Sequence, residues 1–167
     1  MSKKVERNYL EINFLEDLKK TSNFSEKYSV SLVNPVDFQL NKFFYKNIGN
    51  KHKWVDRLVW TEEQWMNYAS SKNVKTFILK CKDDLVGFFE LIHHQEKKEV
   101  EIAYLGILEE YHNKKLGSYL LSEAIKESFK NKIIRTWVHT CTLDHKNALN
   151  NYITRGMKIF KTEIINI

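Results

Sequence analysis

Proline, glycine and cysteine are all scarce in this sequence. It has one proline (Pro35), five glycines and two cysteines, Cys81 and Cys141, in 167 residues. Two cysteines are too few for the disulfide framework of a small secreted domain, and they fit a reduced cytosol. No apolar run approaches the length of a membrane-spanning helix, and the first residues, MSKKVERNYL, lack the apolar centre of a signal peptide. The sequence therefore predicts a soluble, cytoplasmic protein with no membrane association.

Apolar and aromatic residues are abundant enough to build a core. The apolar fraction is 43%, with 10 Phe, 8 Tyr and 4 Trp, which argues against disorder. A chain of this length is expected to form one domain, residues 1–167. The formal net charge of +6 would suit an anionic partner, but the lysines are spread through every segment and match no recognised nucleic-acid motif. A solvated lysine-rich surface is therefore favoured, and a ribosome- or nucleic-acid-associated protein stays as an alternative.

With so few prolines and glycines, the secondary structure has to be assigned from hydrophobic periodicity. Thr61 and Gln64 form a capping box that starts one helix, while Gly49 and Gly156 end two others. The order of elements indicates a mixed α/β fold, with helices, then an antiparallel meander, then alternating strands and helices. Strands are expected at 9–15, 29–33, 76–81, 85–93, 99–108, 133–140 and 157–165, and helices at 36–49, 61–70, 116–129 and 145–155.

The segment 100–118, VEIAYLGILEEYHNKKLGS, joins an apolar strand to an amphipathic helix through a short turn that contains lysines. Such a junction directs free backbone N–H groups and the positive end of a helix dipole at one point. An anion such as a pyrophosphate would suit that point. The sequence therefore predicts an anion site at the start of the helix 116–129.

The turn HNKKLG matches part of a known pyrophosphate loop, which has Gln or Arg, two variable residues, Gly, a variable residue, and then Gly or Ala. His112, Lys115 and Gly117 take the three defined positions, so only the last glycine is kept. The imidazole of His112 can donate a hydrogen bond, and Lys115 adds positive charge near the phosphates. Lys115 also stands where glycine would let the backbone approach closely.

A second motif follows near the C-terminus. Ala148, Tyr152 and Gly156 have the spacing of a pattern that runs from Asn through Ala, Tyr and Gly to Phe, with His145 and Met157 in the outer positions. By these two motifs the chain resembles the GNAT superfamily of acyl-CoA N-acyltransferases, over roughly residues 54–163 in its motifs and over the whole chain in element order. The segments KHKWVDRLVW, VGFFEL and WVHTCTLDH resemble a bacterial branch with unassigned substrates.

The resemblance implies a fold and a reaction. The fold would be a central, twisted, mostly antiparallel sheet that is flanked by helices and splayed at the CoA-binding strand. The reaction would move an acetyl group from acetyl-CoA directly to a primary amine of a small molecule or peptide in a ternary complex, without a metal. The backbones of Leu105 and Ile107 would hold the acyl carbonyl and the cofactor. The residues implied to bind acetyl-CoA are Leu105, Gly106, Ile107, His112, Asn113, Lys114, Lys115, Leu116, Gly117, Ser118, His145, Asn147 and Tyr152.

Candidate acid and base residues follow from the resemblance and from the strand pattern. Tyr152 would face the cofactor sulfur, and a phenol with a pKa of about 10 can protonate a departing thiolate. Glu101 lies on the motif strand at the position of the catalytic glutamate of the family's histone-acetylating branch. Glu90 is the second candidate base, because the hairpin would place it opposite Ala103 on the face of Glu101, where adjacent carboxylates raise one another's pKa. The alternatives are a solvated Glu101, an ion pair of Glu90 with Arg57 or a lysine, and a water chain as the base.

Trp54, Asp56, Arg57 and Trp60 precede the capped helix and form the candidate acceptor-binding cluster. In the resembling family, the N-terminal helices and their loop wall the acceptor side. Asp56 would suit a cationic amine and Arg57 a carboxylate, which hints at an amino-acid-like acceptor. Aromatic packing is the alternative role for the two tryptophans.

Other kinds of site are disfavoured. The histidine spacing fits no established ligand pattern, so no metal is expected. Covalent catalysis by Cys141 with His139 or His145 is a weaker hypothesis, because cysteines are often simply buried and the resembling family transfers the acyl group directly. A non-catalytic module that binds CoA or a related anion is a further alternative, and a homodimer is an open oligomeric state.

Overall fold

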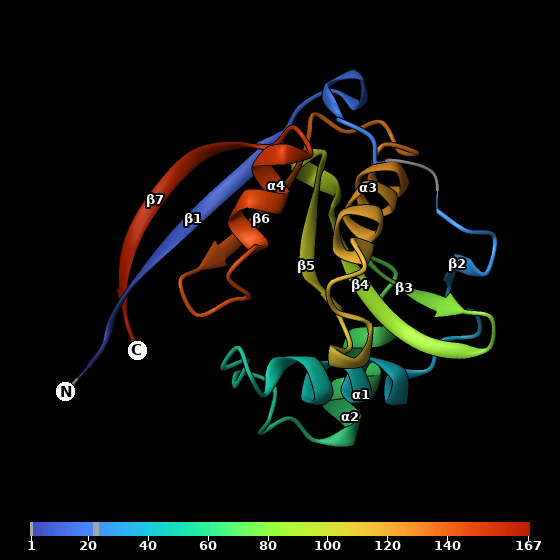
Figure 1. Cartoon of the computed structure of the whole chain (residues 1–167). Helices are drawn as coiled ribbons and strands as arrows, with labels where there is room; N and C mark the ends of the chain where they lie inside the picture. The colour runs from blue at the N-terminus through green and yellow to red at the C-terminus, as the bar shows by residue number, and fades with distance from the viewer. Residues whose placement is uncertain (1, 22–23) are drawn as a thin grey trace.

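The computed structural model describes residues 2–21 and 24–167 (Figure 1). Seven strands, four α-helices and three short 3-10 turns form within this part of the chain. The strands are β1 (Lys4–Ile12), β2 (Tyr28–Leu32), β3 (Val74–Cys81), β4 (Asp84–His94), β5 (Glu99–Ile107), β6 (Arg135–Cys141) and β7 (Lys158–Asn166). The helices are α1 (Phe38–Gly49), α2 (Glu62–Ala69), α3 (Leu116–Ser128) and α4 (Ala148–Thr154). The 3-10 turns are η1 (Leu15–Asp17), η2 (Gln95–Lys97) and η3 (Glu109–Tyr111).

All seven strands belong to one sheet, in the order β2-β3-β4-β5-β6-β1-β7. Neighbouring strands are antiparallel except β5 and β6, which run parallel. The first strand, β1, lies between β6 and the last strand, β7, so both ends of the described chain follow one curved side of the sheet (Figure 1). The predicted mixed α/β fold with a mostly antiparallel sheet is confirmed.

Helices cover both faces of the sheet. The helical spacing of Leu116, Leu120, Leu121, Ala124 and Ile125 puts all five side chains of α3 into the main core, against one face. On the opposite face, α1 and two strands share a smaller core. Its buried members are Phe44, Ile48, Ile78 and Phe88, and the rings of Phe44 and Phe88 stack with their centroids 5.0 Å apart.

Polar caps set the start of both N-terminal helices. The Asp37 carboxylate accepts from the Gln39 backbone N–H at 3.0 Å, so α1 begins at Phe38 rather than at the predicted position 36. The predicted capping box of α2 is confirmed, since Thr61 Oγ1 accepts from Gln64 N at 3.2 Å and Gln64 Oε1 accepts from Thr61 N at 2.8 Å. The capping box at Thr61 fixes the end of the α1–α2 loop, which holds the candidate acceptor cluster.

The sheet separates between β5 and β6. The two strands pair only where Glu99–Glu101 meets Arg135–Trp137, and β5 continues to Ile107 without β6 beside it. The Leu108 N–H donates to Val86 O of β4 at 2.8 Å. Because backbone polar groups alternate in direction along a strand, the N–H groups of Leu105 and Ile107 point away from β4 and into this gap.

Two sequence predictions near the gap are wrong in detail. A register shift in the β4–β5 pair skips Ala103, so Glu90 lies opposite Tyr104 and not opposite Ala103. The last helix was expected at 145–155 and is shorter, because residues 145–147 form a turn before α4 begins at Ala148. β1 is also longer at its start than the predicted 9–15, and Leu15 falls in η1.

Candidate active site

A cavity of about 1380 Å³ opens where β5 and β6 separate. It is walled by the α1–α2 loop, the loop before α3, α4 and the start of β1. The sequence-predicted residues that line it come from the α1–α2 loop, β5, the loop before α3, the start of α3, the turn before α4 and α4 itself: Trp54, Asp56, Arg57, Trp60, Glu101, Leu105, Gly106, Ile107, His112, Asn113, Lys115, Leu116, Gly117, Ser118, His145, Asn147 and Tyr152. Two predicted residues, Glu90 and Lys114, do not line this cavity.

The loop before α3 presents its backbone to the cavity. Asn113 and Lys115 have positive φ values of 64° and 61°, a left-handed conformation that usually favours glycine. The backbone of Lys115 therefore has a conformation that a glycine at this position would adopt with less strain. It is the N-cap of α3, and no side chain caps that helix end. The N–H groups of the first turn of α3 thus stay available to an anion.

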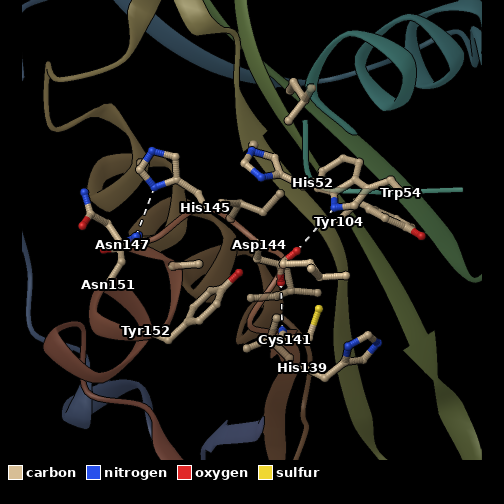
Figure 2. Close-up of a pocket in the computed structure, with 18 of the residues that line it drawn as sticks. His52, Trp54, Tyr104, His139, Cys141, Asp144, His145, Asn147, Asn151 and Tyr152 are labelled. Atoms are coloured by element: carbon tan, nitrogen blue, oxygen red, sulfur yellow. Dashed lines mark hydrogen bonds between the residues drawn. The ribbon is translucent and has the colours of Figure 1, made fainter. Parts of the chain in front are cut away.

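Three histidines gather at the same end of the cavity. The rings of His112 and His145 lie 5.3 Å apart, and those of His145 and His52 lie 6.0 Å apart. His112 Nε2 hydrogen-bonds to Ile107 O at 2.9 Å, which ties the loop to the end of β5. His145 Nδ1 accepts from the Asn147 backbone N–H at 3.1 Å, as Figure 2 shows. Burial, followed by the charges of His112 and His52, lowers the pKa of His145.

Tyr152 reaches the cavity from α4 and is otherwise buried. Burial, with a smaller contribution from the Asp144 carboxylate, raises the pKa of its phenol above the ordinary value. Asp144 itself is held in place, because Oδ2 accepts from Thr140 Oγ1 at 2.5 Å and from Cys141 N at 3.1 Å. Its Oδ1 accepts from Trp54 Nε1 at 3.5 Å, which links the α1–α2 loop to the end of β6 (Figure 2).

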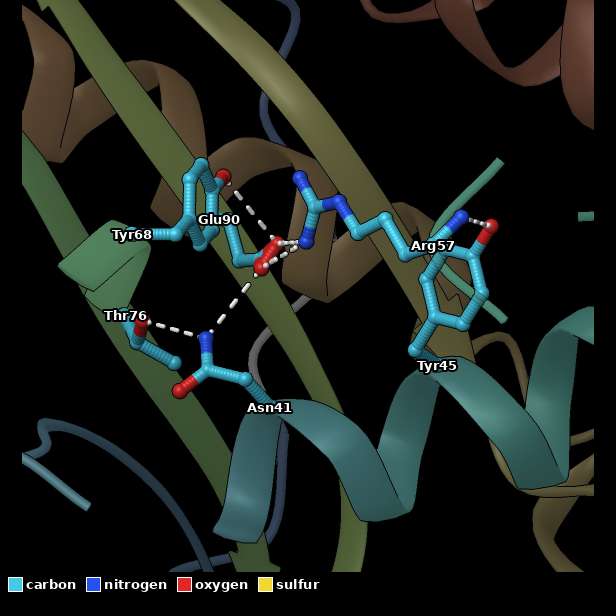
Figure 3. Close-up of polar contacts among 6 residues, drawn as sticks. All are labelled: Asn41, Tyr45, Arg57, Tyr68, Thr76 and Glu90. Carbon is cyan, nitrogen blue, oxygen red and sulfur yellow. Dashed lines mark hydrogen bonds and ion pairs between the residues drawn. The ribbon is translucent and has the colours of Figure 1, made fainter. Parts of the chain in front are cut away.

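The two candidate bases have different surroundings. Glu101 lines the cavity, and its Oε1 lies 3.2 Å from His94 Nε2. Glu90 is fully buried, and both of its oxygens accept from Arg57 Nη1, at 2.7 and 3.0 Å. Asn41 Nδ2 and the Tyr68 hydroxyl also donate to Glu90, at 3.1 and 3.2 Å (Figure 3).

Arg57 is enclosed by aromatic rings as well as paired with Glu90. Its guanidinium carbon lies within 4.1–5.7 Å of five ring centroids. Burial is the largest single effect and lowers the pKa of Arg57, but Glu90, together with Tyr68 and Tyr104, outweighs it, so the pKa is raised. The ion pair holds the middle of the α1–α2 loop against β4. The loop residues Trp54 and Asp56 are thereby positioned at the cavity. The five rings are those of Tyr45, Trp60, Trp65, Tyr68 and Tyr104.

Sequence reasoning missed several residues that face the cavity. Asp144, His52, Tyr104 and Arg7 all line it. His52 and Asp144 fall in the segments KHKWVDRLVW and WVHTCTLDH, but the sequence assigns neither of them a role, and the proximity of all four residues depends on loops and strands that are distant in sequence. Alternation on the strand 133–140 predicts that His139 faces the same side as Cys141, and both line the cavity. Within the described residues, no three His, Cys, Asp or Glu side chains are placed to hold a metal ion, and no helix among them is long and apolar enough to cross a membrane.

Several solved structures share this fold. The GCN5-related N-acetyltransferase from Kribbella flavida has a TM-score of 0.67 at 14% identity, covering 95% of this chain and 56% of that one. The one from Sphaerobacter thermophilus has a TM-score of 0.72 at 13% identity, covering 99% and 52%. An aminoglycoside acetyltransferase, meta-AAC0020, from an uncultured soil metagenomic sample, solved in complex with trehalose, has a TM-score of 0.65 at 11% identity, covering 80% and 90%.

These likenesses show the fold, and the chain spans little more than half the length of the first two structures. No curated protein matches the chain. The profile of the acetyltransferase (GNAT) family, however, matches residues 38–157. That span runs from α1 to the end of α4 and includes the β5–β6 gap, the loop before α3 and Tyr152. This chain therefore belongs to the acetyltransferase (GNAT) family.

Proposed function

We propose that this chain transfers an acetyl group from acetyl-CoA to a primary amine. The observation that carries the proposal is the meeting of two sets of backbone N–H groups in one cavity. One set belongs to Leu105 and Ile107 at the β5–β6 gap, and the other to the first turn of α3. The first set suits the thioester oxygen and the pantetheine chain, and the second suits the phosphates. Family membership supports acetyl-CoA as the donor.

The residues at the phosphate end fit a pyrophosphate. A Cβ built on Gly117 would find only Asn151 Nδ2, at 3.8 Å, so the first turn of α3 has open space in front of it. Lys115 adds positive charge at that turn, and His112 is held against the end of β5. Lys114, which does not line the cavity, would act on the phosphates only through its charge.

Tyr152 is the proposed general acid. Because burial raises the pKa of its phenol, the hydroxyl stays protonated at neutral pH. The amine nitrogen bonds to the acetyl carbon, the carbon–sulfur bond breaks, and the phenol gives its proton to the departing thiolate. The products are an amide and the free thiol of CoA.

Glu101 is the proposed base that takes the proton lost by the amine. It lines the cavity, and His94 is its partner in the described structure. Glu90 is a poor candidate, because Arg57 neutralises its charge and Asn41 and Tyr68 occupy its oxygens. We therefore assign Glu90 a structural role and keep a water chain as the alternative to Glu101.

The acceptor side is formed by the α1–α2 loop. Asp56 and Trp54 line the cavity, and Asp56 offers a carboxylate to a cationic amine. Arg57 is already paired with Glu90, which weakens its proposed role in binding an acceptor carboxylate. The aminoglycoside acetyltransferase meta-AAC0020 has also been solved in complex with sisomicin, and this supports including amine-bearing sugars among the acceptors to test.

Release of free CoA thiol over a panel of amines tests the proposal. The panel should include amino acids, polyamines, aminoglycosides, amino sugars and peptides, with acetyl-CoA binding measured separately by calorimetry. Tyr152→Phe should lower kcat by about 100-fold or more and leave acetyl-CoA binding unchanged. Tyr111→Phe is the matched control, because Tyr111 lines the same cavity.

Two outcomes would count against the proposal. If acetyl-CoA binds but no amine in the panel releases CoA thiol, the chain is a non-catalytic CoA-binding module. If Tyr152→Phe turns over as fast as the unmodified protein, Tyr152 is not the acid. Cys141→Ala should keep its activity, since the transfer is direct, and loss of activity with retained acetyl-CoA binding would point to covalent catalysis instead.

A further inference from the structure

The outer edge of β7 is an open edge of the sheet in the described part of the chain, because β7 ends the strand order (Figure 1). β7 has nine residues, whereas β2, at the opposite end of the sheet, has five. Most residues of β7 are exposed, including Ile159 at 45% and Ile164 at 60%. An open edge presents N–H and C=O groups that can pair with another strand, and folded proteins usually shorten such edges or interrupt them with proline. β7 is long and has no proline, so it is a candidate interaction surface.

The pairing of β7 with β1 determines which of its backbone groups face outward. Ile167 N donates to Lys3 O at 3.0 Å, and Ile167 O accepts from Lys3 N at 2.9 Å. The register with β1 is regular from Asn166 back to Lys161. Backbone groups alternate in direction along a strand, so residues at an odd distance from Ile167 direct their N–H and C=O groups away from β1. Thr162 and Ile164 are therefore the central residues of the open edge.

The sequence of β7, KIFKTEIIN, is complementary to itself when two copies run antiparallel about Thr162. In that register Thr162 lies opposite Thr162 of the second copy. Lys161 of each copy lies opposite Glu163 of the other, so opposite charges meet twice. Ile164 of each copy lies beside Ile159 of the other. Opposite charges and apolar pairs across two strands both stabilise a sheet.

The two faces of β7 keep these charged and apolar contacts apart. The register pairs Ile159 and Ile164 with even-numbered residues of β1, which share one face, and pairs Lys161 and Glu163 with odd-numbered ones, which share the other. The register shift in the β1–β7 pair brings Ile159 to the face of Ile164. Contacts across the edge would therefore be apolar on one face and charged on the other.

The contacts that Lys161 and Glu163 make within one chain are compatible with pairing across the edge. Lys161 Nζ lies 3.3 Å from Glu163 Oε2, and Glu163 Oε1 accepts from the Tyr9 hydroxyl at 2.7 Å. The Lys161 side chain is nevertheless 55% exposed, and an ammonium group has three donors. A second copy would extend this pair into a cluster of alternating charges.

We propose that β7 pairs antiparallel with β7 of a second copy of this chain, about a two-fold axis at Thr162. The two Thr162 residues exchange both of their N–H···O hydrogen bonds, and the two sheets join into one. The interface is isologous, as in most two-fold dimers. Ile165 and Ile167 line the cavity, so the same pairing holds one wall of the cavity in place. This inference does not depend on the proposed acetyl transfer.

Sedimentation velocity of the full chain over a concentration series tests the pairing. The unmodified protein should approach twice its mass of 20.0 kDa as the concentration rises. Thr162→Pro removes the outward N–H and leaves the bonds to β1 in place, since proline is tolerated at such edge positions, and only the monomer should remain. Thr162→Ala is the matched control, because both variants lose the hydroxyl that donates to Asn8 Oδ1 at 2.7 Å. Alanine keeps the N–H and should keep the dimer, while circular dichroism checks that both variants are folded.

Two charge variants test the register. Lys161→Glu places carboxylates opposite one another across the axis, and Glu163→Lys places ammonium groups opposite one another. Each variant alone should therefore dimerise about tenfold more weakly. In an equimolar mixture, each acidic position of one variant meets a basic position of the other, and the affinity should return to nearly that of the unmodified protein. The charges within each chain are the same in the mixture as in the separate variants, so this recovery can come only from contacts between chains.

The contrary outcomes are distinct. A chain that stays monomeric at every concentration would overturn the inference. A dimer that Thr162→Pro leaves intact would also overturn it, because that dimer would use another surface. A mixture of the charge variants that associates no better than either variant alone would overturn the register about Thr162. These measurements use no substrate, so they stand apart from the test of acetyl transfer.

Discussion

The buried pair of Arg57 and Glu90 provides the sharpest test of the structural argument. Glu90 is fully buried, and it keeps only the neutral donors of Asn41 and Tyr68 if Arg57 is removed. Removing one partner of a buried ion pair leaves an uncompensated charge, which destabilises a protein by about 3–5 kcal/mol. We therefore expect Arg57→Met to lower the free energy of unfolding by that amount.

Replacing the other member of the pair, Glu90, should lower the free energy of unfolding by less. Glu90→Gln leaves an amide oxygen for Asn41 and Tyr68, and the Arg57 guanidinium keeps its aromatic surroundings, with the Tyr68 ring at 4.1 Å. Cation–π contacts of this kind are worth about 2 kcal/mol when they are desolvated. We expect a loss of about 1–3 kcal/mol for Glu90→Gln.

A double-mutant cycle measures the coupling between the two residues. Urea unfolding of the two single variants and of the double variant Arg57→Met, Glu90→Gln gives the interaction term. We expect the double variant to lose about 2 kcal/mol or more less of the free energy of unfolding than the two single variants lose together. Losses that add to within about 0.5 kcal/mol would refute the reasoning, because each residue would then contribute independently of the other.

The remaining predictions concern the cofactor end of the cavity. Lys115→Gly should raise the free energy of unfolding by up to about 1 kcal/mol, because glycine adopts this left-handed conformation without strain. Lys98→Gly is the control: Lys98 is also left-handed, at φ 53°, but lies away from the cavity, and its replacement should give a similar gain. A decrease in the free energy of unfolding for Lys115→Gly alone would contradict the argument. Gly117→Ala should leave the melting temperature unchanged, since the nearest atom is 3.8 Å from the added Cβ, yet weaken acetyl-CoA binding; unchanged binding in calorimetry would show that no ligand approaches that backbone. The pKa of His145 is lowered by burial and then by His112 and His52, so its neutral form stabilises the fold and this contribution should be lost as the pH falls through its folded pKa. Over the same pH range the affinity for CoA should rise as the imidazole gains charge, and His145→Gln should flatten that rise in a pH series of dissociation constants.

Local signals allowed much of the fold to be predicted. The capping box at Thr61 and the helical spacing from Leu116 to Ile125 depend only on neighbouring residues, and both are confirmed. β1 was harder to predict, because polar residues such as Arg7 and Asn8 interrupt its apolar alternation. Asn8 is nevertheless buried and accepts from Thr162 Oγ1 at 2.7 Å. A strand that satisfies polar residues through a distant partner has no local signature.

The same limit applies to the candidate site. The loop before α3 and the Tyr152 helix could be located because each is a local motif. Glu90 was correctly given an ion pair with Arg57 as an alternative, but its register against β5 depended on the shift that skips Ala103. Asp144 joins Trp54 to the end of β6 across 90 residues of sequence, and no pattern within either segment indicates that contact.

The position of β1 between β6 and β7 also determines when this sheet can be completed. Tyr9 donates to Glu163, a partner 154 residues later in the chain, so β1 closes a very long loop when it pairs. Contacts of such separation slow folding, because the entropy of loop closure is lost before the contacts form. During synthesis β1 must wait, unpaired, until both of its neighbours have been made. We therefore expect the last slow phase of refolding to be the insertion of β1, and hydrogen exchange on β6 and β7 to become protected together with it.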